Sequence, residues 1–330
     1  MSKANKSNKA IKYRLYPNDE QKVMFAKTFG CCRFVYNQLL ALQKQRYKDG
    51  ESHLSKLKSN EFATRTLKKD YDFLKEIDKF AVSNAVFHLA DAYDRFFKKQ
   101  NHFPKFKSKR KSKKSYTTNF IIGKNVIKLP KVGMVKAVIY KLPKDDWKLK
   151  SVTVSQDGVG NYFASVLFEY EQEDIPSVSK SSTNAIGLDY KSDGLYMDSN
   201  GNKAGVHKYY RESHKKLAKQ QRRLSRKAGS KKNETKSSNY FKQMRKVNRI
   251  YRKIANQRLD SLHKKSTEIA NQYDIVCVED LDMKAIGNKG FGNGKATFDN
   301  GYGMFLNMLD YKLKERGKYF VKVDKWYPSS

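Results

Sequence analysis

Two short apolar runs of the sequence each lead directly into carboxylates. Residues 185–188 precede Asp189, and residues 275–278 precede Glu279, Asp280 and, after a leucine, Asp282. Runs rich in β-branched and apolar residues predict buried strands. An ionised carboxylate beside a dry core is costly unless a metal ion or a cationic group compensates it. Carboxylate oxygens also hold the two divalent ions of phosphodiester-cleaving sites, so these strand ends are candidate catalytic positions.

The period of a strand limits which of these acids can act together. Successive side chains point to opposite faces, so Glu279 shares a face with Ile275 and Cys277, whereas Asp280 points to the other face. Only one of the two acids can therefore face Asp189 directly. The ordinary alternative for each of these carboxylates is a turn or helix-cap residue at the end of a strand.

Other kinds of catalytic site find no support in the sequence. The six histidines show no metal-ligand spacing, and no Ser/His/Asp or Cys/His arrangement can be argued. The three cysteines, Cys31, Cys32 and Cys277, include no Cys-x-x-Cys pair, which excludes a disulfide scaffold and a four-cysteine zinc site within these residues. The glycine-rich run 287–294 lacks the spacing and the Ser or Thr of a phosphate loop, so we interpret it as a flap beside the acids.

The charge balance predicts a polyanionic partner. Lys and Arg number 69 against 33 Asp and Glu, a formal net charge of +36, which exceeds what solubility requires. A merely basic soluble protein is the plain alternative, and an anionic membrane surface fits less well because the cations are spread over most of the chain. Aromatic residues make up 13% of the chain, so bases could be stacked as well as phosphates neutralised.

Two segments concentrate this charge. Seven of the ten residues 105–114 are Lys or Arg, none is acidic, and aromatic residues adjoin them; eleven of residues 208–232 are basic, and only Glu212 is acidic. A solvated linker or helix face is the ordinary reading of such runs, and we favour contacts with nucleic-acid phosphates. The predicted nucleic-acid-binding residues are Lys105, Lys107, Lys109, Arg110, Lys111, Lys113, Lys114, Lys215, Lys216, Arg222, Arg223 and Arg226.

The elements that would position these residues fall into two stretches. Residues 9–16 alternate as a strand, Asn18 and Gln21 form a capping box for a long helix, and helices continue to about residue 101. Four alternating runs between 116 and 170 predict a small antiparallel barrel, which the strand near Tyr13 would join. Beyond a linker we expect a three-strand meander (residues 185–204), two long helices, the strand 275–279, a helix over 303–316 and a last strand 319–324. No secretory signal or membrane span is visible, so we expect a cytoplasmic protein.

Six stretches together resemble one known family. They are KYRLYP (12–17), GCCRFVYN (30–37), FPKFK (103–107), IGLD (186–189), VCVEDL (276–281) and WYPSS (326–330), and they lie in family order over nearly the whole chain. The sequence is similar to TnpB, also called OrfB, the compact RNA-guided endonuclease that insertion-sequence transposons encode and that is related to type V CRISPR effectors.

The resemblance implies an α+β multidomain fold. Residues 1–17 and 115–175 would form a wedge-type β-barrel, 18–110 an inserted helical recognition domain, 176–183 a linker, and 184–330 an RNase H-like (RuvC) nuclease domain. It further implies that Asp189 and Glu279 are catalytic and bind Mg²⁺, which leaves Asp280 and Asp282 as turn residues. The implied partners are a guide RNA from the transposon end and a target double-stranded DNA, with neither a membrane nor a small-molecule substrate.

The sequence departs from the family after residue 330. The family continues there with a four-cysteine zinc ribbon and a third catalytic aspartate, and this chain has neither, so the nuclease domain would lack its C-terminal part and Zn²⁺ is not expected. Asp324 ends a strand, but the family pattern does not use it as a substitute. The alternatives to an active nuclease are a nuclease-dead RNA-guided DNA-binding repressor and an inactive transposase remnant.

Overall fold

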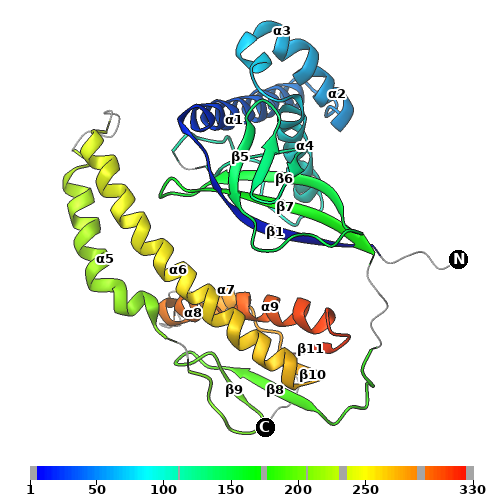
Figure 1. The fold of residues 1–330 in the computed structure, drawn as a ribbon, viewed down its shortest axis with the longest axis vertical. Helices are drawn as coiled ribbons and strands as arrows, with labels where there is room; N and C mark the ends of the chain where they lie inside the picture. The colour runs from blue at the N-terminus through cyan, green and yellow to red at the C-terminus, as the bar shows by residue number, and fades with distance from the viewer. Residues whose placement is uncertain are drawn as a thin grey trace, which may run out of the picture. The chain divides into compact units, whose positions relative to one another are not determined.

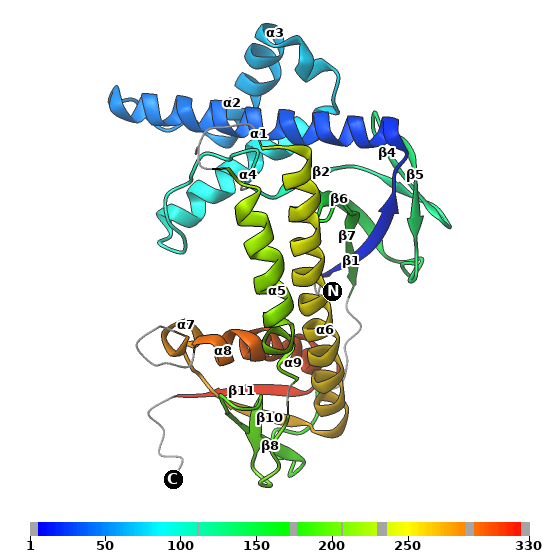
Figure 2. The same ribbon diagram turned by 90° about the vertical axis from the view of Figure 1, so that its left-hand side faces the viewer.

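The protein divides into two compact units, Met1–Gln172 and Glu173–Ser330. The computed structural model describes residues 6–110, 112–171, 177–205, 207–229, 236–287 and 294–324. Both units mix helices with a sheet (Figures 1 and 2). Every helix of these residues is too short or too polar to cross a lipid bilayer. The finer division into a barrel, a recognition domain, a linker and a nuclease domain stays a prediction.

The first unit is built on one curled antiparallel sheet with the strand order β2-β6-β7-β1-β5-β4-β3. The first strand pairs along nearly its whole length with β7, and its last residues also pair with β5, as the alternation near Tyr13 predicted. The described ladder runs from β2 to β3 without closing, so the wedge-barrel description stays a prediction. The strands are β1 (Lys6–Tyr16), β2 (Lys114–Thr118), β3 (Ile121–Ile122), β4 (Val126–Leu129), β5 (Gly133–Val138), β6 (Lys148–Gln156) and β7 (Tyr162–Glu171).

Helices are inserted between β1 and β2. The predicted capping box is confirmed: the Gln21 backbone N–H donates to Asn18 Oδ1 at 2.8 Å, and the Asn18 backbone N–H donates to Gln21 Oε1 at 3.1 Å. These bonds satisfy backbone donors that a helix start leaves free. The helical elements are α1 (Asp19–Lys48), α2 (Lys56–Glu61), the π-helical η1 (Phe62–Leu67), α3 (Lys68–Asp70), the 3₁₀ turn η2 (Asp72–Lys75) and α4 (Lys79–Phe97).

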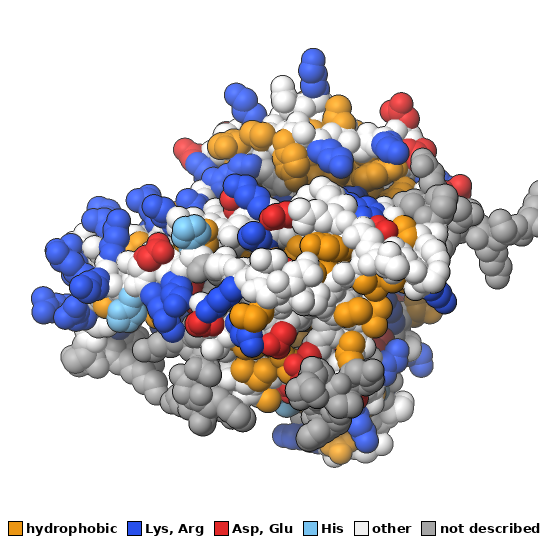
Figure 3. Space-filling view, turned by 90° about the horizontal axis from the view of Figure 1, so that it is seen from below, with side chains coloured by type: hydrophobic (Ala, Val, Ile, Leu, Met, Phe, Trp, Pro, Cys, Tyr) orange, Lys and Arg blue, Asp and Glu red, His pale blue; other side chains and the backbone are white. Residues whose placement is uncertain are grey.

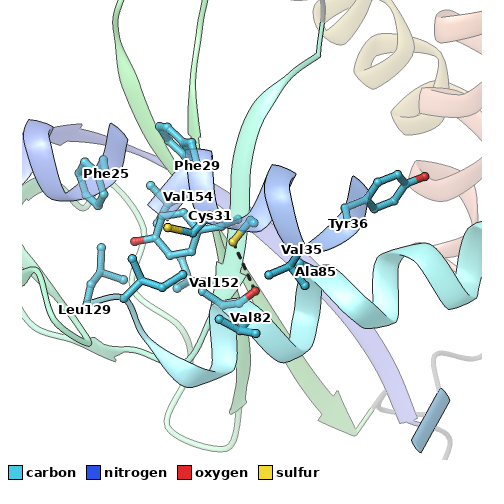
Figure 4. Packing of buried hydrophobic residues seen from close by; sticks show 14 of the residues in the cluster. Phe25, Phe29, Cys31, Val35, Tyr36, Val82, Ala85, Leu129, Val152 and Val154 are labelled. Atoms are coloured by element: carbon cyan, nitrogen blue, oxygen red, sulfur yellow. Dashed lines mark hydrogen bonds between the residues drawn. The ribbon is translucent and has the colours of Figure 1, made fainter. Parts of the chain in front are cut away.

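One hydrophobic core joins the sheet to α1 and α4. Tyr13 and Leu15 of β1 are fully buried, because alternate residues of the strand face the helices. Val23 falls on the outer side of α1, and its side chain is 56% exposed. Figure 4 shows the packing around Phe25, Phe29, Cys31, Val35 and Tyr36 of α1, Val82 and Ala85 of α4, and Leu129, Val152 and Val154 of the sheet.

The second unit contains a four-stranded sheet with the order β11-β10-β8-β9. Its central strand β10 (Ile275–Glu279) runs parallel to both β8 (Ala185–Tyr190) and β11 (Tyr319–Val323), while β9 (Tyr196–Asp198) is antiparallel to β8. The expected third strand of the meander is wrong: residues 201–204 contribute only a single bridge, between Met197 and Lys203. The helices are α5 (Tyr209–Arg226), α6 (Ser238–Gln272), α7 (Met283–Ile286), α8 (Gly294–Asn300) and α9 (Tyr302–Lys314).

Helices cover one face of this sheet. Figures 1 and 2 show α5 and α6 side by side as a long hairpin, and the C-terminal half of α6 lies against α9. The core is formed by Ile186 and Leu188 of β8 and Val276 and Val278 of β10, packed on α6 and α9. Since side chains alternate along a strand, Gly187, Asp189, Cys277 and Glu279 lie on the opposite face.

Candidate active site

The pairing of β8 with β10 brings Asp189 and Glu279 next to each other. The two strands are parallel, and Leu188 is the register partner of Val278. Asp189 and Glu279 are therefore the next residues on neighbouring strands. Because Leu188 and Val278 point into the core, both carboxylates point to the uncovered face. This arrangement matches the interpretation that Glu279, and not Asp280, faces Asp189.

Both carboxylates line a cavity of about 440 Å³ on that face. Two further acids line it, Asp198 at the end of β9 and Asp324 directly after β11. Asp324 reaches the cavity because Val323 is the register partner of Glu279 in the parallel pair. The remaining lining residues are largely apolar or small: Gly187, Leu188, Met197, Ser199, Cys277, Val278 and Val323.

The neighbouring acids of the second motif have other roles. Asp280 pairs with Lys322 at 2.7 Å, an exposed contact outside the cavity. Asp282 Oδ1 accepts the Ala285 backbone N–H at 3.2 Å at the start of α7. These contacts agree with the interpretation of Asp280 and Asp282 as structural residues at the end of the strand.

A lysine partly compensates the charge of the site. Lys191 Nζ lies 2.8 Å from Asp189 Oδ2, and the Asp189 side chain is 59% exposed. Asn300 donates from its side chain to the backbone carbonyls of Lys191 and Ser192 at 3.3 and 3.0 Å, which holds the turn after β8. A cation bound at Asp189 would have to displace or share the position of the Lys191 ammonium.

A buried tyrosine that the sequence did not single out lies beneath the two acids. Tyr302 is 1% exposed, and its hydroxyl donates to the Leu188 carbonyl at 3.4 Å. Burial, reinforced by the negative charges of Asp189 and Glu279, raises the pKa of Tyr302 well above its usual value. Tyr302 therefore stays protonated and keeps a neutral donor under the strand that carries Asp189. No periodicity or motif marks it, because its role depends on where α9 crosses the sheet.

The donor set is suited to a hard divalent cation, though it is sparse. Mg²⁺ is commonly held by one or two carboxylates while substrate phosphates and water complete its shell, and Asp189 and Glu279 can supply that number. In the described ranges, no group of three or more His, Cys, Asp and Glu side chains is close enough to hold a metal ion. The residues fit one ion better than a complete two-metal cage.

The basic segment 105–114 lies in the first unit. Lys105, Lys109, Arg110, Lys113 and Lys114 are exposed, and Lys111 lies outside the described residues. Lys107 differs, because it is half-buried. Its backbone N–H donates to Asn37 Oδ1 at 2.8 Å and its carbonyl accepts from Asn37 Nδ2 at 2.9 Å. Its ammonium lies 3.7 Å from the centre of the Tyr36 ring. Lys107 thus fastens the segment to α1.

The second basic segment lies on α5 in the other unit. Lys215, Lys216, Arg222, Arg223 and Arg226 are all exposed, and none of them pairs with an acid of the described residues. In Figure 3 Lys and Arg side chains gather at the left of the view, where α5 lies in Figure 1. The glycine-rich run expected to form a flap lies mostly outside the described residues, and the nucleic-acid-binding roles stay predictions.

Comparisons with known proteins place the chain in a family. A helix-turn-helix domain model of the OrfB family of IS605-type elements matches residues 7–52, and that family's "Probable transposase" model matches residues 167–288. The chain is 33% identical to a "Putative RNA-guided DNA endonuclease" of Streptomyces pristinaespiralis, over 98% of this chain and 79% of that protein. It is 28% identical to the "Putative RNA-guided DNA endonuclease InsQ" of Escherichia coli K12, over 97% and 81%.

A solved structure shares the fold. The Cas12f1 chain of a Cas12f1–sgRNA–target DNA complex matches with a TM-score of 0.52 at 12% identity, over 97% of this chain and 89% of that chain. Within residues 7–52 the structure shows strand β1 and one continuous helix, α1, rather than two helices joined by a turn. The relatives and the matching family models together show that the chain belongs to the TnpB/OrfB family of insertion-sequence proteins.

Proposed function

We propose that this protein binds a guide RNA from the transposon end and a target double-stranded DNA, and that its second unit, an RuvC-like domain, cleaves DNA with Mg²⁺. The observation that carries the proposal is the side-by-side position of Asp189 and Glu279 in one open cavity. The relatives' names, the Cas12f1-like fold and the net charge of +36 support nucleic acid as the partner.

In this proposal the carboxylates of Asp189 and Glu279 would bind the cation next to the scissile phosphate. A bound Mg²⁺ would polarise the phosphodiester and lower the pKa of an attacking water. Asp189 and Glu279 would hold the ion, and Tyr302 supports the Leu188 backbone next to Asp189. Met197, Cys277 and Val323 line the same cavity.

The first test concerns RNA. The full chain should co-purify with RNA that high salt removes, because phosphate contacts release counterions. Sequencing the RNA should return the transposon end. Protein that emerges free of nucleic acid at low salt would contradict the proposal.

The second test separates catalysis from folding. Asp189→Asn and Glu279→Gln should abolish Mg²⁺-dependent cleavage of a target matched to the RNA. Loss of the exposed Asp189–Lys191 pair should cost at most about 1 kcal/mol, so the unfolding free energy should barely change. RNA binding should also stay intact. A variant that fails to fold would instead support a structural role for these acids.

A second candidate function is RNA-guided DNA binding without cleavage. It is favoured by the lack of a three-ligand metal group among the described residues. Wild-type protein that binds RNA and matched DNA with Mg²⁺ present, yet leaves the DNA uncut, would favour this guided repressor. Protein that binds RNA without guided recognition of DNA would indicate an inactive transposase remnant.

A further inference from the structure

The first unit contains a small cavity that shares no lining residue with the candidate catalytic site of the second unit. It lies among α1, α4 and the segment that leads into β2, and it measures about 50 Å³. A single water needs only roughly 10–15 Å³ by this kind of measure, so the cavity has room for roughly three to five atoms of that size. No carboxylate appears among its lining residues, which include Arg33, Lys107, Lys109, Lys113 and Lys114.

Two of these cations are partly buried without a counter-ion. Arg33 and Lys107 are each half-buried, and neither pairs with an acid of the described residues. Burial lowers the pKa of Lys107 from its usual value, the expected effect on a cation that lacks a carboxylate partner. The Asn37 side chain holds the Lys107 backbone from both sides, which keeps this residue at the cavity wall, and its ammonium lies 3.7 Å from the centre of the Tyr36 ring. Buried charges without a partner are costly, and an anion in the cavity would remove that cost.

A buried aromatic residue forms part of the cavity wall. Tyr116 lines the cavity and is 3% exposed. Its ring is held by Phe25 and Phe29, with centroids 6.3 and 5.8 Å away, so this wall is rigid.

We propose that this cavity binds one phosphate group of a nucleic-acid chain. Arg33 and Lys107 supply the charge, Arg33 through a guanidinium that can donate two parallel hydrogen bonds to phosphate oxygens. The exposed Lys109, Lys113 and Lys114 then lie where neighbouring phosphates of the same strand would pass. The inference rests on the proposed function only in naming nucleic acid as the source of the phosphate.

The test measures the affinity of the full chain for a fluorescein-labelled single-stranded RNA. Arg33→Gln should weaken binding about ten-fold or more, because it removes a charge-assisted contact in a confined site. Lys48→Gln is the matched control: it removes the same charge from the same helix at an exposed position outside the cavity. It should weaken binding by no more than about two-fold.

The outcomes are distinguishable. Equal losses for Arg33→Gln and Lys48→Gln, in a wild type that binds RNA, would overturn the cavity and leave the proposed function standing. Wild type that binds neither RNA nor DNA would overturn the proposed function itself.

A second experiment measures the Tm of the full chain in inorganic phosphate and in chloride at equal ionic strength. A phosphate-specific rise in Tm that Arg33→Gln abolishes, with RNA affinity unchanged, would assign the cavity to free phosphate and overturn the nucleic-acid source. If Arg33→Gln does not fold, Lys107→Gln repeats the comparison, because the Asn37 contacts use only the backbone of Lys107.

Discussion

The ion pair between Asp299 and Arg258 should dominate the stability of the second unit. Asp299 is 2% exposed and lies at the end of α8; its Oδ1 accepts from Arg258 Nη2 of α6 at 3.1 Å. The same carboxylate accepts the backbone N–H groups of Tyr210 and Arg211 at 3.2 and 3.4 Å. It therefore caps the N-terminus of α5, whose own N-cap residue, Lys208, provides no side-chain bond.

The expected loss of unfolding free energy depends on which contacts each substitution removes. Asp299→Ala leaves the Arg258 guanidinium, on a side chain that is 18% exposed, without its carboxylate partner and removes the cap of α5, which should cost about 3–5 kcal/mol. The Tyr210 and Arg211 N–H groups bond to different oxygens of Asp299, so Asp299→Asn keeps an acceptor for only one of them and also loses the charge. A cost of at least about 1.5–3 kcal/mol is therefore expected. Asp310→Ala is the control, because its pair with Lys314 on α9 is exposed and should contribute at most about 0.5 kcal/mol.

Urea unfolding would give these free energies, and amide hydrogen exchange would show whether α5 opens first. Adding Arg258→Met to Asp299→Ala should recover part of the loss, since the stranded charge is then gone. RNA affinity should fall with the order of α5, which carries Lys215, Lys216 and Arg222. Asp299→Ala within about 1 kcal/mol of wild type would refute the reasoning.

Three further predictions concern single positions. Gly301→Ala should destabilise the second unit by about 1–2 kcal/mol in urea unfolding, because φ is +68° and a Cβ would meet the Met304 methyl at 2.9 Å. Gly303→Ala, in open space on α9, should instead stabilise it by about 0.4–1 kcal/mol, and equal effects would contradict the argument. Burial raises the pKa of Tyr13 to about 12 in the folded protein, from 10.0. The unfolded chain therefore loses the phenolic proton at a lower pH, and the free energy of unfolding should fall as the pH rises from 10 to 12. Tyr13→Phe should make that fall smaller, as measured by the urea midpoint at each pH. Lys191→Gln should tighten Mn²⁺ binding, followed by electron paramagnetic resonance, by up to about five-fold, because it frees Asp189, and weaker binding would count against Asp189 as a ligand.

Local features of the fold were predictable and distant ones were not. The Asn18–Gln21 capping box was readable because both partners lie within one helical turn, and the strand near Tyr13 was readable from its alternation. The third strand of the meander failed, because Asp198 binds the backbone N–H groups of Asn200 and Asn202 and closes a tight turn. Residues 201–204 then contribute one bridge instead of a strand.

For the candidate functional residues too, local features were predictable from the sequence and distant contacts were not. Basic residues were identified by composition, but only the structure separates the half-buried Lys107, held by Asn37, from exposed neighbours such as Lys105. Tyr302 and the Asp299–Arg258 pair carry no sequence pattern, because each joins elements that are distant along the chain.

By itself, the sequence determined that two apolar strands end in carboxylates, that Glu279 and Asp280 face opposite ways, and that the chain is strongly basic. These properties follow from residue type and from the two-residue period of a strand. Only the tertiary structure decided that β8 and β10 are parallel neighbours with Leu188 opposite Val278, which brings Asp189 beside Glu279 and adds Asp324 to the same cavity. The physical reason is that strand register is set by how both apolar faces pack on α6 and α9, a contact that neither strand encodes alone.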